Sequence, residues 1–214
     1  MNWYAYCGNN PLIHWDPSGK IREGYYDDAG NYHANPDAEE FGPFSDTYKI
    51  LVDLGHRWYY NPEARVELEN MANEVRRLAR EDTPIQYAQD KVMNQLHENA
   101  QKASAYNNVE QFRKVAYLID RAYGEWNYKL NSDWQVPYEN FNGKNMNVDN
   151  NKNWTAWMYF DGMLLAADDF GNLNMAYVGA KMGLPNWVYQ NFVTTDGKDA
   201  FWVQYGINMV NHGR

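Results

Sequence analysis

The sequence predicts an α+β fold that is mostly α, a helical domain with one embedded β-hairpin near residues 155–168. Three observations lead to this prediction. Apolar residues recur at helical spacing between about residues 45 and 123. Two short apolar runs in the stretch TAWMYFDGMLLAAD flank Asp161-Gly162, a preferred pair for a tight hairpin turn. Two more helical patterns follow the hairpin, and no internal repeat occurs.

Three helices are expected before Asn108. The first covers about residues 45–59. The next two each start at a pair of a capping residue and a first-turn proline, Asn61-Pro62 and Thr83-Pro84. The residues expected to face the core on these two helices are Ala64, Leu68, Met71, Val75 and Leu78, then Ile85, Ala88, Val92 and Leu96.

A fourth helix is expected to start at Asn108, which forms a capping-box-like pair with Gln111, and to end at Gly124. Residues 125–153 are rich in Asn, Gly and Trp and show no clear period. The core-facing residues expected on the fourth helix are Phe112, Val115, Ile119 and Ala122.

Two helices are expected after the hairpin. The first spans residues 173–182 and is closed by Gly183, because glycine accepts the left-handed conformation that often ends a helix. The last covers residues 200–210.

Composition excludes several classes of protein. With 44% hydrophobic residues, a mean hydropathy of −0.79 and no long apolar run, the chain is expected to fold without a membrane span. The net charge is −9, and no basic face is evident, which argues against binding nucleic acid by charge alone. Cys7 is the single cysteine, and no His-Glu-x-x-His or paired His/Asp spacing occurs, so neither a metal nor another cofactor is expected.

Residues 1–19, MNWYAYCGNNPLIHWDPSG, resemble the last segment of an Rhs/YD-repeat core. The pieces Tyr-x-Tyr, Gly-Asn-Asn-Pro and Asp-Pro-x-Gly occur together and in that order. In that family the segment closes a β cage and is followed by a variable domain that is usually a toxin. The resemblance implies a core end at 1–19, a polar linker at 20–43 and a C-terminal toxin domain at 44–214. It also implies autoprocessing by Asp16, with a cut just past Gly19.

A second resemblance, to the bacterial polymorphic toxin type 44 family, rests on three blocks in order. Residues 168–179, DDFGNLNMAYVG, resemble the family's signature. Residues 124–129, GEWNYK, resemble its Gly-x-Trp-Asp-x-Lys, and TDGKD at 195–199 followed by Gly206-Ile207 resembles its end. Two departures bear on the activity of this copy: Asn127 replaces an aspartate, and Ala176 replaces a glycine.

The candidate site lies at the junction of the hairpin and the following helix. Asp168 and Asp169 are expected to end a strand with side chains on opposite faces, so that one of them faces a cleft. The resemblance implies the catalytic candidates Asp168, Asp169, Asn172, Asn174 and Lys129, and the substrate-binding candidates Trp126, Tyr177, Asp196 and Asp199.

The two resemblances imply a secreted antibacterial effector that is delivered into a target bacterial cell and neutralised in its producer by a cognate immunity protein. The type 44 family implies a metal-independent ribonuclease, which needs an acid, a base and a cation. A peptidoglycan or other glycan hydrolase is the alternative hypothesis. Its two carboxyl groups would be Glu125 and either Asp168 or Asp169, and six tryptophans between Trp126 and Trp202 could line a sugar groove. A non-catalytic target-binding module is the third hypothesis.

Overall fold

The computed structural model describes residues 24–26, 32–42, 44–128, 157–190 and 197–214. Helices make up 73% of these residues and a small three-stranded sheet accompanies them, which confirms the predicted α+β, mostly α class. The chain divides into two compact units, one within residues 1–83 with 162–164 and one within residues 84–161 with 165–214. None of the described helices has the length and apolar character needed to cross a membrane.

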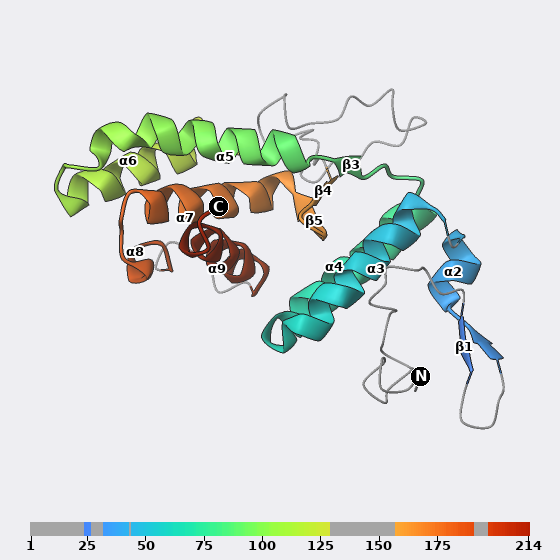
Figure 1. The fold of residues 1–214 in the computed structure, drawn as a ribbon. Helices are drawn as coiled ribbons and strands as arrows, with labels where there is room; N and C mark the ends of the chain where they lie inside the picture. Colours follow the sequence, from blue (N-terminus) through green and yellow to red (C-terminus); the bar gives the residue numbers. More distant parts are fainter. Residues whose placement is uncertain (1–23, 27–31, 43, 129–156, 191–196) are drawn as a thin grey trace. The chain divides into compact units, whose positions relative to one another are not determined.

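The first unit is built on a pair of long helices (Figure 1). Ser45 caps α3 because its Oγ accepts the backbone N–H of Tyr48 at 3.1 Å, and the helix predicted at 45–59 is confirmed. On α4 the predicted core face is confirmed at Leu68, Met71, Val75 and Leu78, which are all buried. The elements of this unit are β1 (Gly24–Tyr26), β2 (Tyr32–Ala34), α2 (Pro36–Phe41), α3 (Asp46–Tyr60), η1 (Pro62–Ala64) and α4 (Arg65–Arg80).

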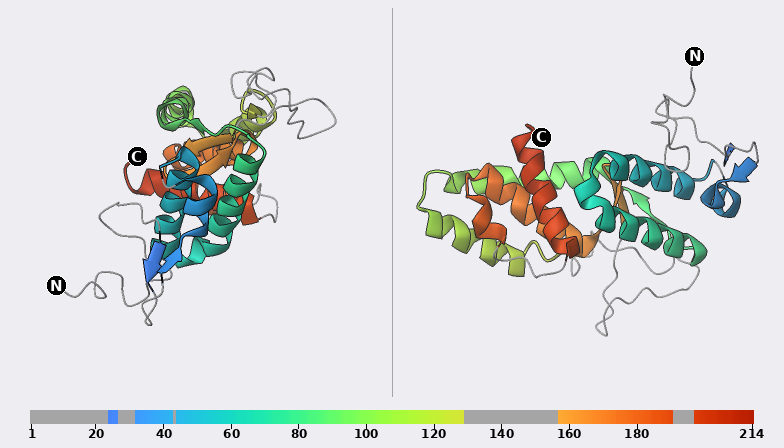
Figure 2. Two further views of the ribbon diagram at one scale, coloured as in Figure 1. Left: turned by 90° about the vertical axis from the view of Figure 1, so that its right-hand side faces the viewer. Right: turned by 90° about the horizontal axis from the view of Figure 1, so that it is seen from below.

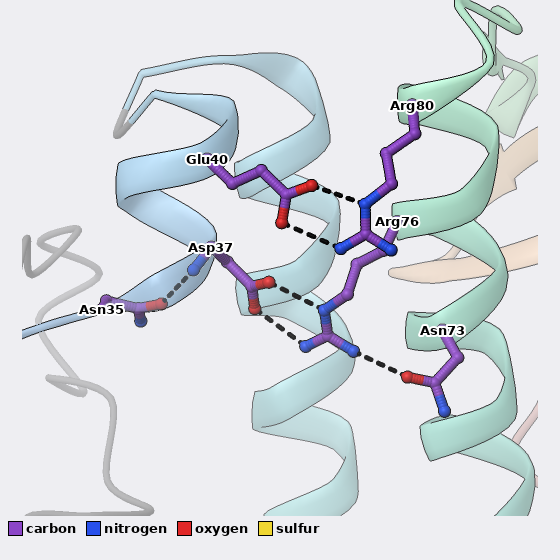
Figure 3. Close-up of polar contacts among 6 residues, drawn as sticks. All are labelled: Asn35, Asp37, Glu40, Asn73, Arg76 and Arg80. Atoms are coloured by element: carbon purple, nitrogen blue, oxygen red, sulfur yellow. Dashed lines mark hydrogen bonds and ion pairs between the residues drawn. The ribbon is translucent and has the colours of Figure 1, made fainter.

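The segment predicted as a linker contains an antiparallel hairpin and a helix that is bound to α4. Asp37 of α2 forms a bidentate ion pair with Arg76, with bonds of 2.7 and 2.8 Å. One turn later, Glu40 pairs with Arg80 at 2.5 and 2.9 Å (Figure 3). Ala38 of α2 is buried in a small apolar cluster, so α2 packs as part of the first unit.

A three-stranded sheet with the order β3-β4-β5 leads into the candidate site. Asp161 and Gly162 both have positive φ, at 51° and 73°, as a type I′ hairpin turn requires, and the predicted hairpin is confirmed. β3 pairs in parallel with β4, with Gln86 opposite Met158. The strands are β3 (Gln86–Tyr87), β4 (Trp157–Phe160) and β5 (Met163–Ala166).

Two helices before the sheet's hairpin differ from their sequence predictions. α5 (Gln89–Ala103) starts later than Thr83-Pro84 because the chain first forms β3. On α6 (Gln111–Tyr123) the predicted core face is wrong, because Phe112 is 65% exposed while Tyr117 and Leu118 are the buried residues. The other three residues predicted for this face are half-buried: Val115, Ile119 and Ala122. Tertiary packing, rather than the apolar spacing of the helix itself, decides which side of α6 is buried.

The second unit is organised around α7 (Ala167–Lys181), which packs against α5, α6, α8 (Asn186–Gln190) and α9 (Gly197–Asn211). The two helices predicted after the hairpin are confirmed as α7 and α9, and both begin earlier than predicted. α9 crosses α7 (Figure 2), and their backbones approach closely at Gly206. A Cβ at this glycine would lie only 2.6 Å from the carbonyl oxygen of Leu173, so the crossing excludes a side chain here.

Candidate functional site

An ion pair between a buried carboxylate and a partly exposed ammonium joins the first turns of α7 and α9. The Nζ of Lys198 lies 2.8 Å from Oδ2 of Asp169, and the same oxygen accepts the backbone N–H of Ala166 at 3.2 Å. The Asp169 side chain is 2% exposed, whereas 37% of the Lys198 side chain reaches solvent. Both contacts are made by Oδ2 of Asp169.

The surroundings of Asp169 bring its proton equilibrium near neutral pH. Burial raises the pKa of Asp169 from 3.8 to about 7, because a buried carboxylate loses its hydration, and the charge of Asp168 adds to this rise. The Lys198 ammonium acts in the opposite direction and limits it. Burial alone would lower the pKa of Lys198, but Asp169, Asp168 and Asp199 together raise it. A charged ammonium therefore lies beside a carboxyl group that exchanges its proton near pH 7.

Two further contacts surround this ion pair. The Nδ2 of Asn172, one turn beyond the start of α7, donates to Oδ1 of Asp199 on α9 at 2.7 Å. The Nζ of Lys198 lies over the ring of Trp157 in β4, 5.7 Å from the ring centroid. The structure thus brings Asp169, Asn172 and Asp199 of the predicted set together between α7 and α9.

The local sequence explains why these groups meet. β5 ends at Ala166 and α7 begins at the next residue, so Asp168 and Asp169 lie in the first turn of a helix rather than at the end of a strand. Carboxylates are stabilised at this position by the unpaired N–H groups and the helix dipole. The close crossing at Gly206 holds α9 against α7. Asp169, which contacts Lys198 of α9, is buried, whereas Asp168 is exposed.

Asn174 lies in a buried hydrogen-bond network on another side of α7. It is 0% exposed, and its Oδ1 accepts the Nδ2 of Asn99 at 2.9 Å. The same Nδ2 donates to the hydroxyl of Tyr128 at 2.7 Å. Burial raises the pKa of Tyr128, so this phenol stays protonated and serves as a hydrogen-bonding group. This network ties α5 to α7, and a catalytic role for Asn174 remains a prediction.

Two predicted substrate-binding aromatics lie in the core. Trp126 is 2% exposed and packs edge-on against Tyr117 with ring centroids 5.9 Å apart. Tyr177 is 0% exposed, and its hydroxyl donates to the backbone oxygen of Arg214 at 3.1 Å. These positions favour a packing role for both rings, and substrate contact remains a prediction.

Glu125, the carboxylate of the glycan-hydrolase hypothesis, is exposed and paired with two cations. Its carboxylate lies 3.3 Å from Lys102 and 2.5 Å from Arg121. Lys129, Asp196 and Asp16 lie outside the described residues.

Sequence reasoning missed Lys198 and Trp157. Lys198 lies inside the TDGKD block, but nothing in that block shows that its ammonium meets a carboxylate about thirty residues earlier. Trp157 was counted only as one tryptophan in an aromatic-rich stretch. In the part of the chain that the structure describes, no group of three or more His, Cys, Asp or Glu side chains is arranged to hold a metal ion.

The three blocks of the type 44 resemblance meet in space around α7. The block at residues 124–129 contacts α7 through Tyr128, whose ring centroid lies 4.5 Å from that of Phe170. The block that contains TDGKD and Gly206-Ile207 contacts α7 through Lys198 and Gly206. No protein-family model, no curated protein and no solved structure matches the chain. The family resemblances therefore rest on the sequence blocks alone.

Proposed function

We propose that this chain is the end of an Rhs/YD-repeat polymorphic toxin, and that its C-terminal part cleaves phosphodiester bonds in RNA without a metal. The toxin acts inside the target bacterial cell, and a cognate immunity protein protects the producer. One observation carries the proposed reaction. A buried carboxyl group with a pKa near 7, Asp169, is in contact with a partly exposed ammonium, that of Lys198.

These two groups supply what cleavage of RNA requires. Ionised Asp169 accepts the proton of a ribose 2′-hydroxyl while that oxygen attacks phosphorus. The bond from phosphorus to the 5′-oxygen breaks, and the leaving oxygen takes a proton from water. The Lys198 ammonium offsets the charge that grows on the non-bridging phosphate oxygens. Asp169 then releases its proton to solvent, which a pKa near 7 permits at neutral pH.

A glycan hydrolase is the second candidate, and the charge balance of the cluster favours it. Three carboxyl groups, Asp168, Asp169 and Asp199, act on the single ammonium of Lys198. A surplus of carboxylates repels a polyanion more than a neutral sugar chain. Asp169, a carboxyl group with a pKa near 7, lies next in sequence to a second carboxyl group, Asp168, and such a pair resembles the two carboxyl groups that glycosidases use.

Expression in two compartments distinguishes the candidates. Residues 20–214 are produced in a bacterial host with and without an export signal, so that α2 stays attached to the first unit. A ribonuclease kills only from the cytoplasm and degrades RNA there, whereas a wall hydrolase kills only after export. Asp169→Asn is expected to abolish killing in whichever of the two compartments the unaltered protein kills. Asp120→Asn, which changes an exposed aspartate on α6, is the matched control and stays toxic.

A further inference from the structure

We propose that Trp157 is a positioning residue for the site described above, whose indole face holds the Lys198 ammonium against the Asp169 carboxylate. The inference rests on the proposed function, in which the Asp169–Lys198 pair does the chemistry. It adds a residue that neither of the two family resemblances singles out.

The geometry places Lys198 between two attractive groups. Its Nζ is 2.8 Å from Oδ2 of Asp169 and 5.7 Å from the centroid of the Trp157 ring. The face of an indole ring carries partial negative charge and attracts a cation within about 6 Å. Lysine has a long flexible side chain, so a second attraction restricts the positions that its ammonium visits.

The ring face is the part of Trp157 that matters here. Its Nε1 is buried and makes no hydrogen bond among the described residues, so hydrogen bonding of the indole does not explain its placement. Trp157 belongs to β4, the central strand of the β3-β4-β5 sheet, which gives the ring a fixed support. The Lys198 side chain is 37% exposed, so part of it remains open to a substrate.

Loss of this support has a predictable electrostatic consequence. The charged groups that act on Asp169 are Lys198 of α9, which favours the carboxylate, and Asp168 of α7, which disfavours it. Asp199 of α9 acts on Lys198. When the ring is removed, Lys198 spends less time beside Asp169, and its stabilisation of the carboxylate weakens. The pKa of Asp169 then rises.

The test is a double-mutant cycle read by carboxyl carbon NMR titration of Asp169 in the full 214-residue chain. The variants are Trp157→Leu, Lys198→Met and the double variant. Because an exposed cation–π contact changes an equilibrium about twofold to fivefold, Trp157→Leu is expected to raise the pKa of Asp169 by about half a unit. In the Lys198→Met background the same substitution changes nothing further, because the cation is absent.

Two outcomes overturn the inference. One is an unchanged Asp169 pKa in a folded Trp157→Leu variant, and the other is an equal shift with and without Lys198. If Trp157→Leu does not fold, Trp157→Phe carries the same cycle, since it keeps a ring with a weaker face charge. A smaller rise that again depends on Lys198 supports the inference, and no rise overturns it.

This readout separates the inference from the proposed function. If Asp169→Asn remains toxic, the proposed function fails, although the cycle still reports how Lys198 is held. If Asp169→Asn is no longer toxic but the cycle shows no dependence on Lys198, the catalytic role of the Asp169–Lys198 pair is retained and the role of Trp157 is withdrawn.

Discussion

The attachment of α2 to α4 is expected to depend on one of its two ion pairs far more than on the other. Asp37 and Arg76 form two parallel bonds of 2.7 and 2.8 Å, and their side chains are only 14% and 29% exposed. Glu40 and Arg80 have the same bidentate arrangement, but their side chains are 40% and 57% exposed (Figure 3). The second pair is therefore a matched control that differs mainly in burial.

Charge-assisted hydrogen bonds contribute about 1.5–3 kcal/mol when water is largely excluded. We therefore expect a coupling free energy of about 1.5–3 kcal/mol between Asp37→Ala and Arg76→Ala in a double-mutant cycle. The cycle cancels the separate interaction of Asp37 with the N-terminus of α2, because that term is present in both arms. The coupling between Glu40→Ala and Arg80→Ala is expected to be smaller, because solvent and salt screen exposed pairs.

Amide hydrogen exchange over residues 37–41 of the full chain measures the opening of α2 directly. Faster exchange is expected in Asp37→Ala and in Arg76→Ala, and the double variant is expected to exchange little faster than either. Equal coupling in the two pairs, or a larger coupling between Glu40 and Arg80, would refute the reasoning from burial.

Three other substitutions test the packing and the charge of the second unit. Gly206→Ala is expected to lower the free energy of unfolding by about 1–3 kcal/mol in thermal unfolding, because its Cβ would overlap the Leu173 backbone. Gly171→Ala is the tolerated control, since its Cβ would lie 3.5 Å from its nearest neighbour, the backbone oxygen of Trp126. Asn174→Ala is expected to cost about 1–3 kcal/mol, because Asn99 loses a buried partner. The folded-state pKa of Asp169 lies above its unfolded value, so the stability that this group contributes is present below about pH 4 and is lost as the pH rises through 7. The stability of the wild type relative to Asp169→Asn is therefore expected to fall by up to about 4 kcal/mol between pH 4 and 8 in urea unfolding, and a flat difference would contradict this.

Local signals in the sequence were sufficient for the elements that depend on neighbouring residues. Ser45 predicts the start of α3 because its hydroxyl reaches an N–H three residues later. Asp161-Gly162 predicts the hairpin because both residues tolerate positive φ. β3 was not predicted, since a strand of two residues exists only through its partner β4, about seventy residues away.

In the candidate site too, the features set by neighbouring residues were predicted and those set by distant residues were not. The sequence indicated the hairpin-to-helix junction and named Asp168 and Asp169, but it could not choose between them. The choice depends on tertiary structure, because Asp169 is buried and paired with Lys198 of α9 whereas Asp168 is exposed. Lys198 and Trp157 were not predicted as site residues for the same reason. The Lys198–Asp169 ion pair and the Lys198–Trp157 contact form only when α7, α9 and β4 come together in the fold.

The pH dependence of RNA cleavage by the purified chain tests the central claim most directly. The rate at limiting substrate is expected to rise with pH and to level off near the Asp169 pKa of about 7, as that group ionises. Asp169→Asn is expected to lower the rate at least 100-fold and to remove this inflection, while Asp120→Asn keeps both. Cleavage by Asp169→Asn at the wild-type rate with the same pH profile would contradict a catalytic role for the Asp169–Lys198 pair.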